Sequence, residues 1–275
     1  MAAATGKTTG RTGLRGTPDW TLLLGAGFVY LFLYAPILVL MFFSFNSTRS
    51  TQVWTGFSLE WYGELLRDQS VHDAFRTSLI VGVVATAIAT VIGTFAALAL
   101  SRHGFRGQTF ADTTIYAATV MPEIVVGVSL LVFFVAIQFT LGITTIIIAH
   151  VAFTISFVTI VVRARLSGMD RSIEEAAQDL GASPVQTFLR VTLPLILPGV
   201  MAGALLAFTL SFDDFVITYF ISGVGSTTLP LKIYSMIKFG VSPVINALST
   251  VVLVATRTIV ESALMTGLTP NLIME

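Results

Sequence analysis

The sequence predicts an all-α, polytopic membrane protein with six transmembrane helices. Of its 275 residues, 55% are hydrophobic and only 11% are charged, whereas soluble domains carry about 25% charged residues. A helix needs about 20 mostly apolar residues to cross the hydrocarbon core of a bilayer. Six stretches reach that length, and they are residues 20–45, 78–100, 113–139, 143–162, 195–221 and 245–268.

The N-terminal sequence and the net charge indicate how the chain is organised and which partner class is not expected. Residues 1–18 form a polar Gly/Thr/Ala tail that we expect to be disordered, and residues 19–275 form one transmembrane domain. The first span is too long for the apolar region of a cleaved signal peptide, and no small-residue cleavage site follows it. A formal net charge of zero gives no sign of a nucleic-acid partner.

Neither metal binding nor covalent chemistry is predicted. The chain has no cysteine, which excludes disulfides and thiolate metal sites. His72, His103 and His150 lie in three separate segments without metal-ligand spacing. No nucleophile–base pattern is visible, so we expect no catalytic residue, no metal and no cofactor.

Positive charges predict the orientation, because Lys and Arg collect on the cytoplasmic side of a membrane protein. In a six-span chain, nine of the fifteen Lys and Arg residues share one side with both ends. Five lie on the other side, and Arg257 lies within the last span. Both termini are therefore expected in the cytoplasm.

Between the fourth and fifth spans, residues 163–194 form a polar, helix-forming connection on that same side. Ser172 and Glu175 fit a capping box at a helix start. Gly181 suits the left-handed position after a helix end, and Ser183-Pro184 suits a second helix start. We expect two short helices with a bend between them. Spacing alone leaves open whether they seal the bundle or dock into a groove of a soluble partner.

Acidic side chains within spans are the second unusual feature. An ionised carboxylate at mid-bilayer costs about 2.5–3.5 kcal/mol, and such groups usually face a cavity or mark a substrate path. Four fall within the predicted spans, namely Glu123, Asp213, Asp214 and Glu261. With no lysine inside a span, the first three favour a cationic substrate.

The helical period separates the two aspartates of the fifth span. Small or polar residues at three- and four-residue spacing form a strip, comprising Gly203, Ala207, Ser211, Asp214 and Thr218. Such a strip is typical of close helix packing, but a carboxylate at its centre favours a solvated path. Asp214 is therefore a candidate substrate contact, with a structural hydrogen-bonding role as the alternative. Asp213 lies about 100° further round, and both roles stay open for it.

The other two carboxylates have explanations of each kind. Glu123 follows Pro122, which should kink the third span and free backbone groups for binding; alternatively, Glu123 is simply hydrated at the interface. Glu261 lies four residues after Arg257, a spacing that allows an ion pair. Alternatively, Arg257 pairs with an aspartate of the fifth span.

The polar connection resembles the EAA loop of ABC importer permeases. The match is Glu175-Ala-Ala-x-x-x-Gly181, then nine residues, then Val191-x-Leu193-Pro194, with valine where isoleucine is usual. The resemblance implies a type I ABC importer permease fold in which residues 163–194, here called the coupling loop, contact an ATPase. The implied contact residues are Glu175, Ala176, Ala177, Gly181 and Pro194. The chain itself shows only a chance Gly6-Lys7-Thr8 match to a phosphate-binding loop, so ATP hydrolysis is expected on another chain.

Further segments resemble permease subunits of spermidine/putrescine ABC importers, and within them the second of the two permeases. These segments are Ser211-Phe-Asp-Asp214, 229–236, Gly240-Val-Ser-Pro243 with Asn246-Ala-Leu, Ser44-Phe-Asn46 and 54–62. The likeness weakens in the last helix, at Arg257 and Glu261.

This resemblance implies polyamine import across a bacterial inner membrane by alternating access. It implies a heterodimer with a second permease, a cytoplasmic ATPase dimer and an extracytoplasmic polyamine-binding protein, all in contact with membrane lipid. Asp213, Asp214, Glu123 and Thr218 are the expected pathway residues. Outer aromatic residues such as Trp54 and Trp61 contact the binding protein or amines, or form an interfacial belt. The alternatives are a permease for another organic cation or a ferric complex, and a stand-alone secondary transporter or channel.

Overall fold

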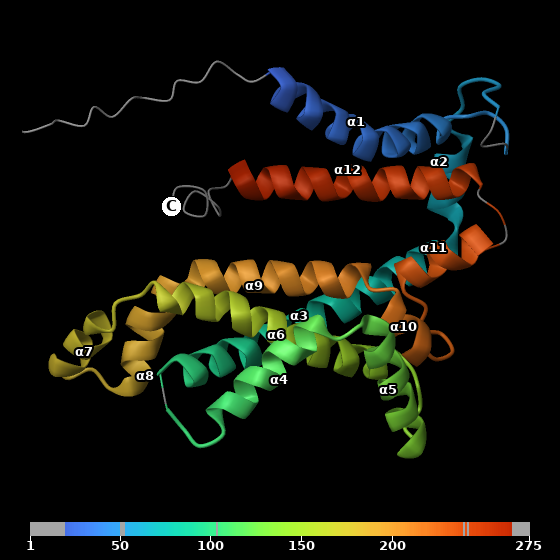
Figure 1. The fold of residues 1–275 in the computed structure, drawn as a ribbon. Coiled ribbons are helices and arrows are strands. Elements are labelled where there is room, and N and C mark those ends of the chain that lie inside the picture. Colours follow the sequence, from blue (N-terminus) through green and yellow to red (C-terminus); the bar gives the residue numbers. More distant parts are fainter. Residues whose placement is uncertain (1–19, 50–52, 103, 239, 241, 266–275) are drawn as a thin grey trace, which may run out of the picture.

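The computed structural model describes residues 20–49, 53–102, 104–238, 240 and 242–265, so the predicted tail lies outside the described residues. Within these ranges the chain is helical, and the strand-like pairing is limited to one bridge between Asn46 and Phe57. The predicted all-α class is confirmed (Figure 1). The helices are α1 (Trp20–Phe43), α2 (Glu60–Arg67), α3 (Gln69–Arg102), α4 (Gln108–Val120), α5 (Glu123–Ala136), α6 (Ile143–Ser167), α7 (Ser172–Asp179), α8 (Pro184–Thr187), the π-helical turn η1 (Phe188–Thr192), α9 (Leu193–Asp213), α10 (Val216–Ile221), α11 (Leu229–Lys238) and α12 (Pro243–Met265).

The described helices account for the predicted spans. Four stretches are long and apolar enough to cross a membrane, and they are Leu22–Phe43, Gln69–Arg102, Ile143–Ser167 and Pro184–Asp213. The pair α4 and α5 makes a fifth span that is bent by 109°. In α12 the apolar part, Pro243–Ala255, is shorter. The count agrees with six spans when α12 is included.

The centre of the molecule is a bundle of α3, α6 and α9, which pack against one another (Figure 1). Small residues allow this close approach. A β-carbon at Gly93 of α3 would lie 2.8 Å from the side chain of Val158 in α6, and one at Gly203 of α9 would lie 3.4 Å from it. Val158 itself is fully buried. Without a hydrophobic driving force in lipid, such tight contacts are what hold membrane helices together.

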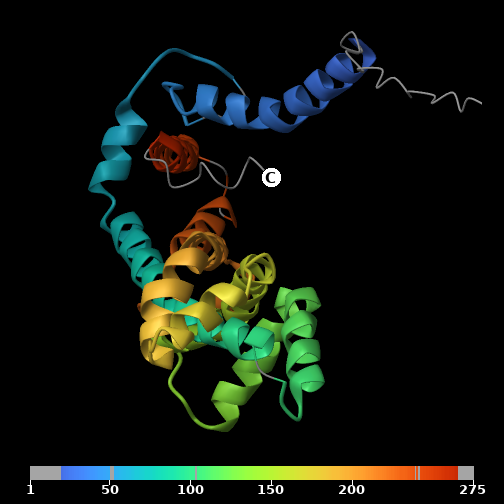
Figure 2. The same cartoon turned by 90° about the vertical axis from the view of Figure 1, so that its left-hand side faces the viewer.

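The helices α1 and α12 lie side by side, apart from this bundle, in both views (Figures 1 and 2). They are joined to it at one end by an apolar cluster from α2, α3, α11 and α12, whose buried members include Trp61, Leu65, Leu229 and Leu248. The apolar stretch of α1 has no buried position. Its surface is therefore available to lipid or to another chain.

The loop between α1 and α2 is held by its own polar groups. The indole N–H of Trp61 donates to the Asn46 carbonyl oxygen, and the Tyr62 hydroxyl lies 2.7 Å from the Ser44 hydroxyl. Trp61 is buried, whereas Trp54 stacks on Phe42 and stays partly exposed. Trp61 is therefore part of the packed structure, whereas the Trp54 ring keeps an exposed face.

Candidate functional site

The third span is broken at the proline that predicts its kink. The α4 helix ends at Val120, Met121 is extended with φ −66° and ψ 131°, and α5 begins at Glu123 directly after Pro122. The predicted kink is confirmed, and it is a complete break of 109°. Glu123 lies exposed in the first turn of α5.

The fifth span is broken as well, and here the prediction of one continuous helix from 195 to 221 is wrong. The α9 helix ends at Asp213, Asp214 is extended with φ −64° and ψ 123°, and α10 begins at Val216. No proline causes this break. Instead, the Asp214 carboxylate accepts hydrogen bonds from the backbone N–H groups of Ile217 and Thr218, at 3.2 and 2.8 Å. An aspartate that accepts from the first free N–H groups of a helix favours a new helix start.

The break turns the two neighbouring aspartates in different directions. Asp213 is exposed, whereas Asp214 is only 8% exposed and Thr218 is fully buried. The Thr218 hydroxyl donates to Asp214 Oδ2 at 2.8 Å. Protein donors thus occupy Asp214, and this geometry favours the structural role that the sequence left open for it. Asp213 is the exposed carboxylate of this pair.

A buried histidine completes the surroundings of Asp214. His150 of α6 is 1% exposed, and its Nε2 lies 3.2 Å from Asp214 Oδ2 and 3.0 Å from Thr218 Oγ1. Its Nδ1 lies 2.7 Å from the Ser211 hydroxyl. Sequence reasoning missed this residue because it sought metal-ligand spacing among the histidines. The available signal was an ionisable side chain in the middle of an apolar span, which is a functional hypothesis in itself.

The strip of small residues on the fifth span is the packing face. All five members are buried, and they are Gly203, Ala207, Ser211, Asp214 and Thr218. His150 and Val158 of α6 contact this strip. The prediction from the helical period that these residues share one face is therefore confirmed on both sides of the break, and that face is turned to α6.

The two breaks lie near each other because α5 and α10 pack together. At Gly127 of α5 an added β-carbon would lie 2.9 Å from the Phe220 ring and 3.3 Å from the Ile217 α-carbon. This close contact brings Glu123 within electrostatic reach of Asp213 and Asp214. The candidate site is therefore the pair of exposed carboxylates, Glu123 and Asp213, at two broken spans. Irregular backbone at membrane depth occurs where it is buried in protein or lines a water-filled cavity.

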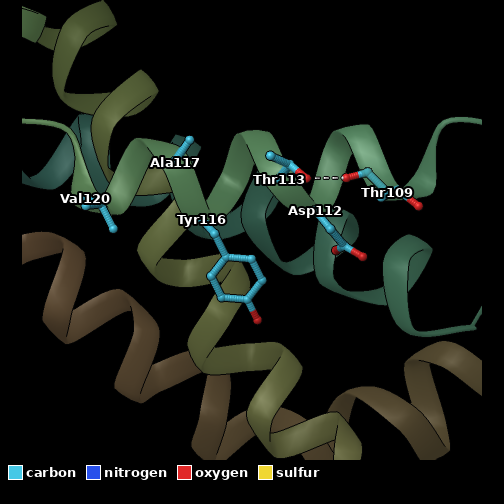
Figure 3. A pocket seen from close by; sticks show the side chains of 6 residues that line it. All are labelled: Thr109, Asp112, Thr113, Tyr116, Ala117 and Val120. Carbon is cyan, nitrogen blue, oxygen red and sulfur yellow. Dashed lines mark hydrogen bonds between the residues drawn. The ribbon is translucent and has the colours of Figure 1, made fainter.

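Two hollows have neither of these carboxylates among their lining residues. A groove of about 480 Å³ runs along α4, and Figure 3 shows its lining from Thr109 to Val120 on that one helix. Its Asp112 is paired with Arg163 of α6. A second cleft, of about 880 Å³, carries Asp73 together with Arg76, Lys232 and Lys238. An excess of positive charge distinguishes this cleft from the acidic site.

The coupling loop has the two predicted short helices, α7 and α8, and Gly181 between them has the predicted left-handed φ of +88°. The predicted second helix start at Ser183-Pro184 is confirmed, since α8 begins at Pro184 and the Ser183 hydroxyl accepts the Gln186 N–H. The predicted capping box at the start of α7 is wrong: no side chain caps α7 from its N-cap position, and Asp170 Oδ1 accepts the Ser172 N–H instead. The α8 helix continues through η1 into α9 without a break, and the axis turns there (Figure 1).

Of the predicted coupling residues, Glu175, Ala176 and Gly181 are exposed, Ala177 is half-buried, and Pro194 lies in the first turn of α9. Large apolar side chains beside them are exposed as well, with Leu180 at 90% and Val185 at 66%. An exposed apolar surface with polar neighbours is typical of a protein contact. The charged neighbour Glu174, in contrast, is tied inward. It pairs with Arg102 of α3 at 3.2 Å and accepts a hydrogen bond from Thr192 at 2.7 Å.

Two broken spans that carry exposed carboxylates, together with an exposed loop between packed spans, define a membrane transport protein. The chain belongs to the family described as binding-protein-dependent transport system inner membrane components, whose model matches residues 89–272. It is therefore a multi-pass inner membrane protein.

Curated relatives and solved structures agree with this family. The chain is 48% identical to the putrescine transport system permease protein PotI of Escherichia coli K12, over 84% of each chain. It is 43% identical to the spermidine/putrescine transport system permease protein PotC of the same organism, over 84% of this chain and 89% of that protein. A bacterial ABC transporter that imports alginate has the same fold, with a TM-score of 0.71 and 16% identity over 88% of this chain and 95% of that one. The type I ABC importer permease fold is thus confirmed.

Proposed function

We propose that this chain is the permease subunit of an ATP-driven polyamine importer. Its 48% identity to a putrescine permease is the observation that carries the proposal. The exposed carboxylates of Glu123 and Asp213 support a cationic substrate independently of that likeness, because carboxylates within a span mark substrate paths. The chain then supplies a path and performs no covalent step.

Asp213 and Glu123 contact the ammonium groups of the substrate in this proposal. Asp214 and Thr218, which the sequence also places on the pathway, shape the break from within the protein, since their polar atoms already bond to each other and to His150. Two exposed carboxylates on separate helices suit a flexible polycation, whose amines bind at more than one point. Alternating access would open this site first outward and then inward.

The partners follow from the surfaces that the chain leaves uncovered. The coupling loop, with Glu175, Ala176, Ala177, Gly181 and Pro194, docks on a cytoplasmic ATPase dimer, which places both termini in the cytoplasm. A second permease covers apolar surface such as that of α1, whose apolar stretch has no buried position. An extracytoplasmic binding protein delivers the polyamine to the outer side.

The test is uptake of radiolabelled putrescine and spermidine by proteoliposomes that contain the chain with its partner subunits and binding protein. We expect ATP-dependent uptake of one or both, reduced at least tenfold by Asp213→Asn and by Glu123→Gln. Glu64→Gln removes an exposed carboxylate from the outer helix α2 and serves as the matched control, with normal uptake. Full uptake by both site variants would refute the acidic path, and no uptake of either amine by the unaltered complex would refute the function.

A further inference from the structure

His150 is the buried ionisable side chain that the proposed function leaves unused. It is fully enclosed between α6 and the fifth span, and its ring reaches both halves of the broken helix. We propose that His150 is a positioning residue for transport, which holds the α9–α10 break together and thereby fixes the direction of the exposed Asp213 carboxylate. The inference rests on the polyamine import proposed above.

The two ring nitrogens of His150 contact opposite sides of the break. Nδ1 lies 2.7 Å from Ser211 Oγ, in the last turn of α9. Nε2 lies 3.2 Å from Asp214 Oδ2 and 3.0 Å from Thr218 Oγ1, which belongs to α10. One rigid ring from a neighbouring helix therefore connects the two halves of the span in place of the missing helical hydrogen bonds.

The hydrogen-bond partners fix the tautomer in which this connection is complete. The Thr218 hydroxyl already donates its proton to Asp214 Oδ2, and an ionised carboxylate only accepts. Nε2 must therefore carry the proton that it shares between Thr218 Oγ1 and Asp214 Oδ2. In a neutral ring, Nδ1 is then the acceptor of the Ser211 hydroxyl proton, and every polar atom of the cluster has a partner.

Asp213 depends on this network because it is the last residue of α9 and is joined by one peptide bond to Asp214. Asp214 has the extended conformation that ends the helix, and its carboxylate is held by the N–H groups of α10 and by His150. If the ring is removed, Asp214 loses one of its buried partners and the Ser211 hydroxyl loses its contact across the break. The backbone at the break can then relax, and the Asp213 side chain loses its fixed position relative to Glu123.

The experiment compares uptake kinetics of the complete transporter in proteoliposomes, with putrescine and spermidine delivered by the binding protein. We expect His150→Ala to raise the KM at least tenfold with a smaller change in kcat. His150→Gln keeps an N–H donor near Asp214 and should recover most of the wild-type KM. Thr159→Val is the control, because Thr159 is equally buried on α6 and its hydroxyl bonds within that helix.

Coupling to Asp213 provides the decisive measurement. If His150 acts through Asp213, the double variant His150→Ala with Asp213→Asn should have the KM of Asp213→Asn alone, because residues that act as a unit are not additive. Independent, multiplying effects would overturn the proposal. So would equal losses of assembled complex and kcat in the Ala and Gln variants with an unchanged KM, which is the signature of a purely structural histidine.

Two further variants keep the test valid if His150→Ala does not assemble. Ser211→Ala removes only the partner of Nδ1 and should raise the KM about two- to fivefold, whereas His150→Gln should stay close to the wild-type KM. An unchanged KM of Ser211→Ala would overturn the proposal. Wild-type transport of both amines separates this outcome from failure of the proposed function, in which the unaltered complex would import neither.

Discussion

Two pairs of consecutive acidic residues, Asp213–Asp214 in the fifth span and Glu174–Glu175 in the coupling loop, have the same arrangement in very different surroundings. In each pair one carboxylate is turned into the protein and the other is exposed. The inward carboxylate of each pair accepts a threonine hydroxyl, from Thr218 at 2.8 Å or from Thr192 at 2.7 Å. Each also meets a basic side chain from another helix. One member of each pair therefore has partners within the protein, while its neighbour is exposed.

The basic partners differ with depth. Asp214 meets His150, a ring that can complete these hydrogen bonds in its neutral form, and both side chains are almost fully buried. Glu174 meets the permanently charged Arg102, with the two side chains 16% and 13% exposed. Burying two full charges costs several kcal/mol per ion, a penalty that a neutral donor avoids. The more deeply buried carboxylate thus meets a histidine and the less buried one an arginine. In both pairs one carboxylate is bonded within the protein and the other is exposed.

The deeper pair gives the largest expected effect. Asp214→Ala would leave the His150 ring and the N–H groups of Ile217 and Thr218 without their acceptor in a buried place. Each unsatisfied buried group costs about 1–3 kcal/mol, so we expect little assembled complex in the membrane. Detergent extraction followed by size-exclusion chromatography measures the assembled fraction.

Asp213→Ala is the matched control for that experiment, because it removes a carboxylate one residue away that is exposed. It should assemble like wild type and lose uptake. Equal assembly of the two alanine variants would show that the two aspartates are not divided in this way.

The coupling-loop pair predicts a smaller effect on stability. Glu174→Ala removes the partner of Arg102 and Thr192, and hydrogen bonds to charged groups contribute about 1.5–3 kcal/mol. Because this pair keeps some contact with water, we expect the lower part of that range and a measurable drop in the thermal midpoint of the purified complex. Glu175→Ala should leave the midpoint unchanged and reduce the ATP hydrolysis that substrate stimulates. If Glu175→Ala lowered the midpoint as much as Glu174→Ala, the division within this pair would be wrong.

The sequence predicts the parts of the molecule that local rules control. The six spans follow from apolar length, the break at Pro122 from the missing proline N–H, and the left-handed φ of Gly181 from its place after α7. The strip from Gly203 to Thr218 was assigned correctly as one face, and each of its members is buried. Each of these features depends on residues within a few turns of one another.

The rest depends on contacts between distant segments. The break at Asp214 has no local helix breaker, and the carboxylate there is held partly by His150, 64 residues earlier in the chain. The tie between Arg102 and Glu174 spans 72 residues. The predicted capping box of Ser172 and Glu175 does not form, because the Ser172 N–H donates to Asp170 Oδ1 instead. The Glu261 side chain lies outside those that the structure describes, so its predicted pair with Arg257 stays a prediction.

Asp68 extends the comparison to a carboxylate whose hydrogen-bond donors are all within three residues of it, and its removal should have the smallest effect on stability. Asp68 precedes α3 and accepts hydrogen bonds from the N–H and hydroxyl of Ser70 and from the Val71 N–H. Burial by itself raises the pKa of Asp68, but these hydrogen bonds and the charge of Lys232 outweigh it and hold the pKa below its usual value. A carboxyl with a lowered pKa in the folded state stabilises that state above its ordinary pKa, about 3.9, and loses this contribution as the pH falls through the lower folded value.

We therefore expect Asp68→Ala to lower the thermal midpoint of the purified complex slightly at pH 7, and the difference from wild type to shrink only below about pH 4. Asp68→Asn should lie between the two at pH 7, since asparagine also accepts hydrogen bonds at a helix start. Thermal scans of the three proteins from pH 7 to pH 3 measure this. A difference that grows on acidification would mean that the folded protein does not stabilise the Asp68 carboxylate. Asp68 would then differ from Asp214 and Glu174, whose carboxylates are expected to stabilise the fold through their hydrogen bonds.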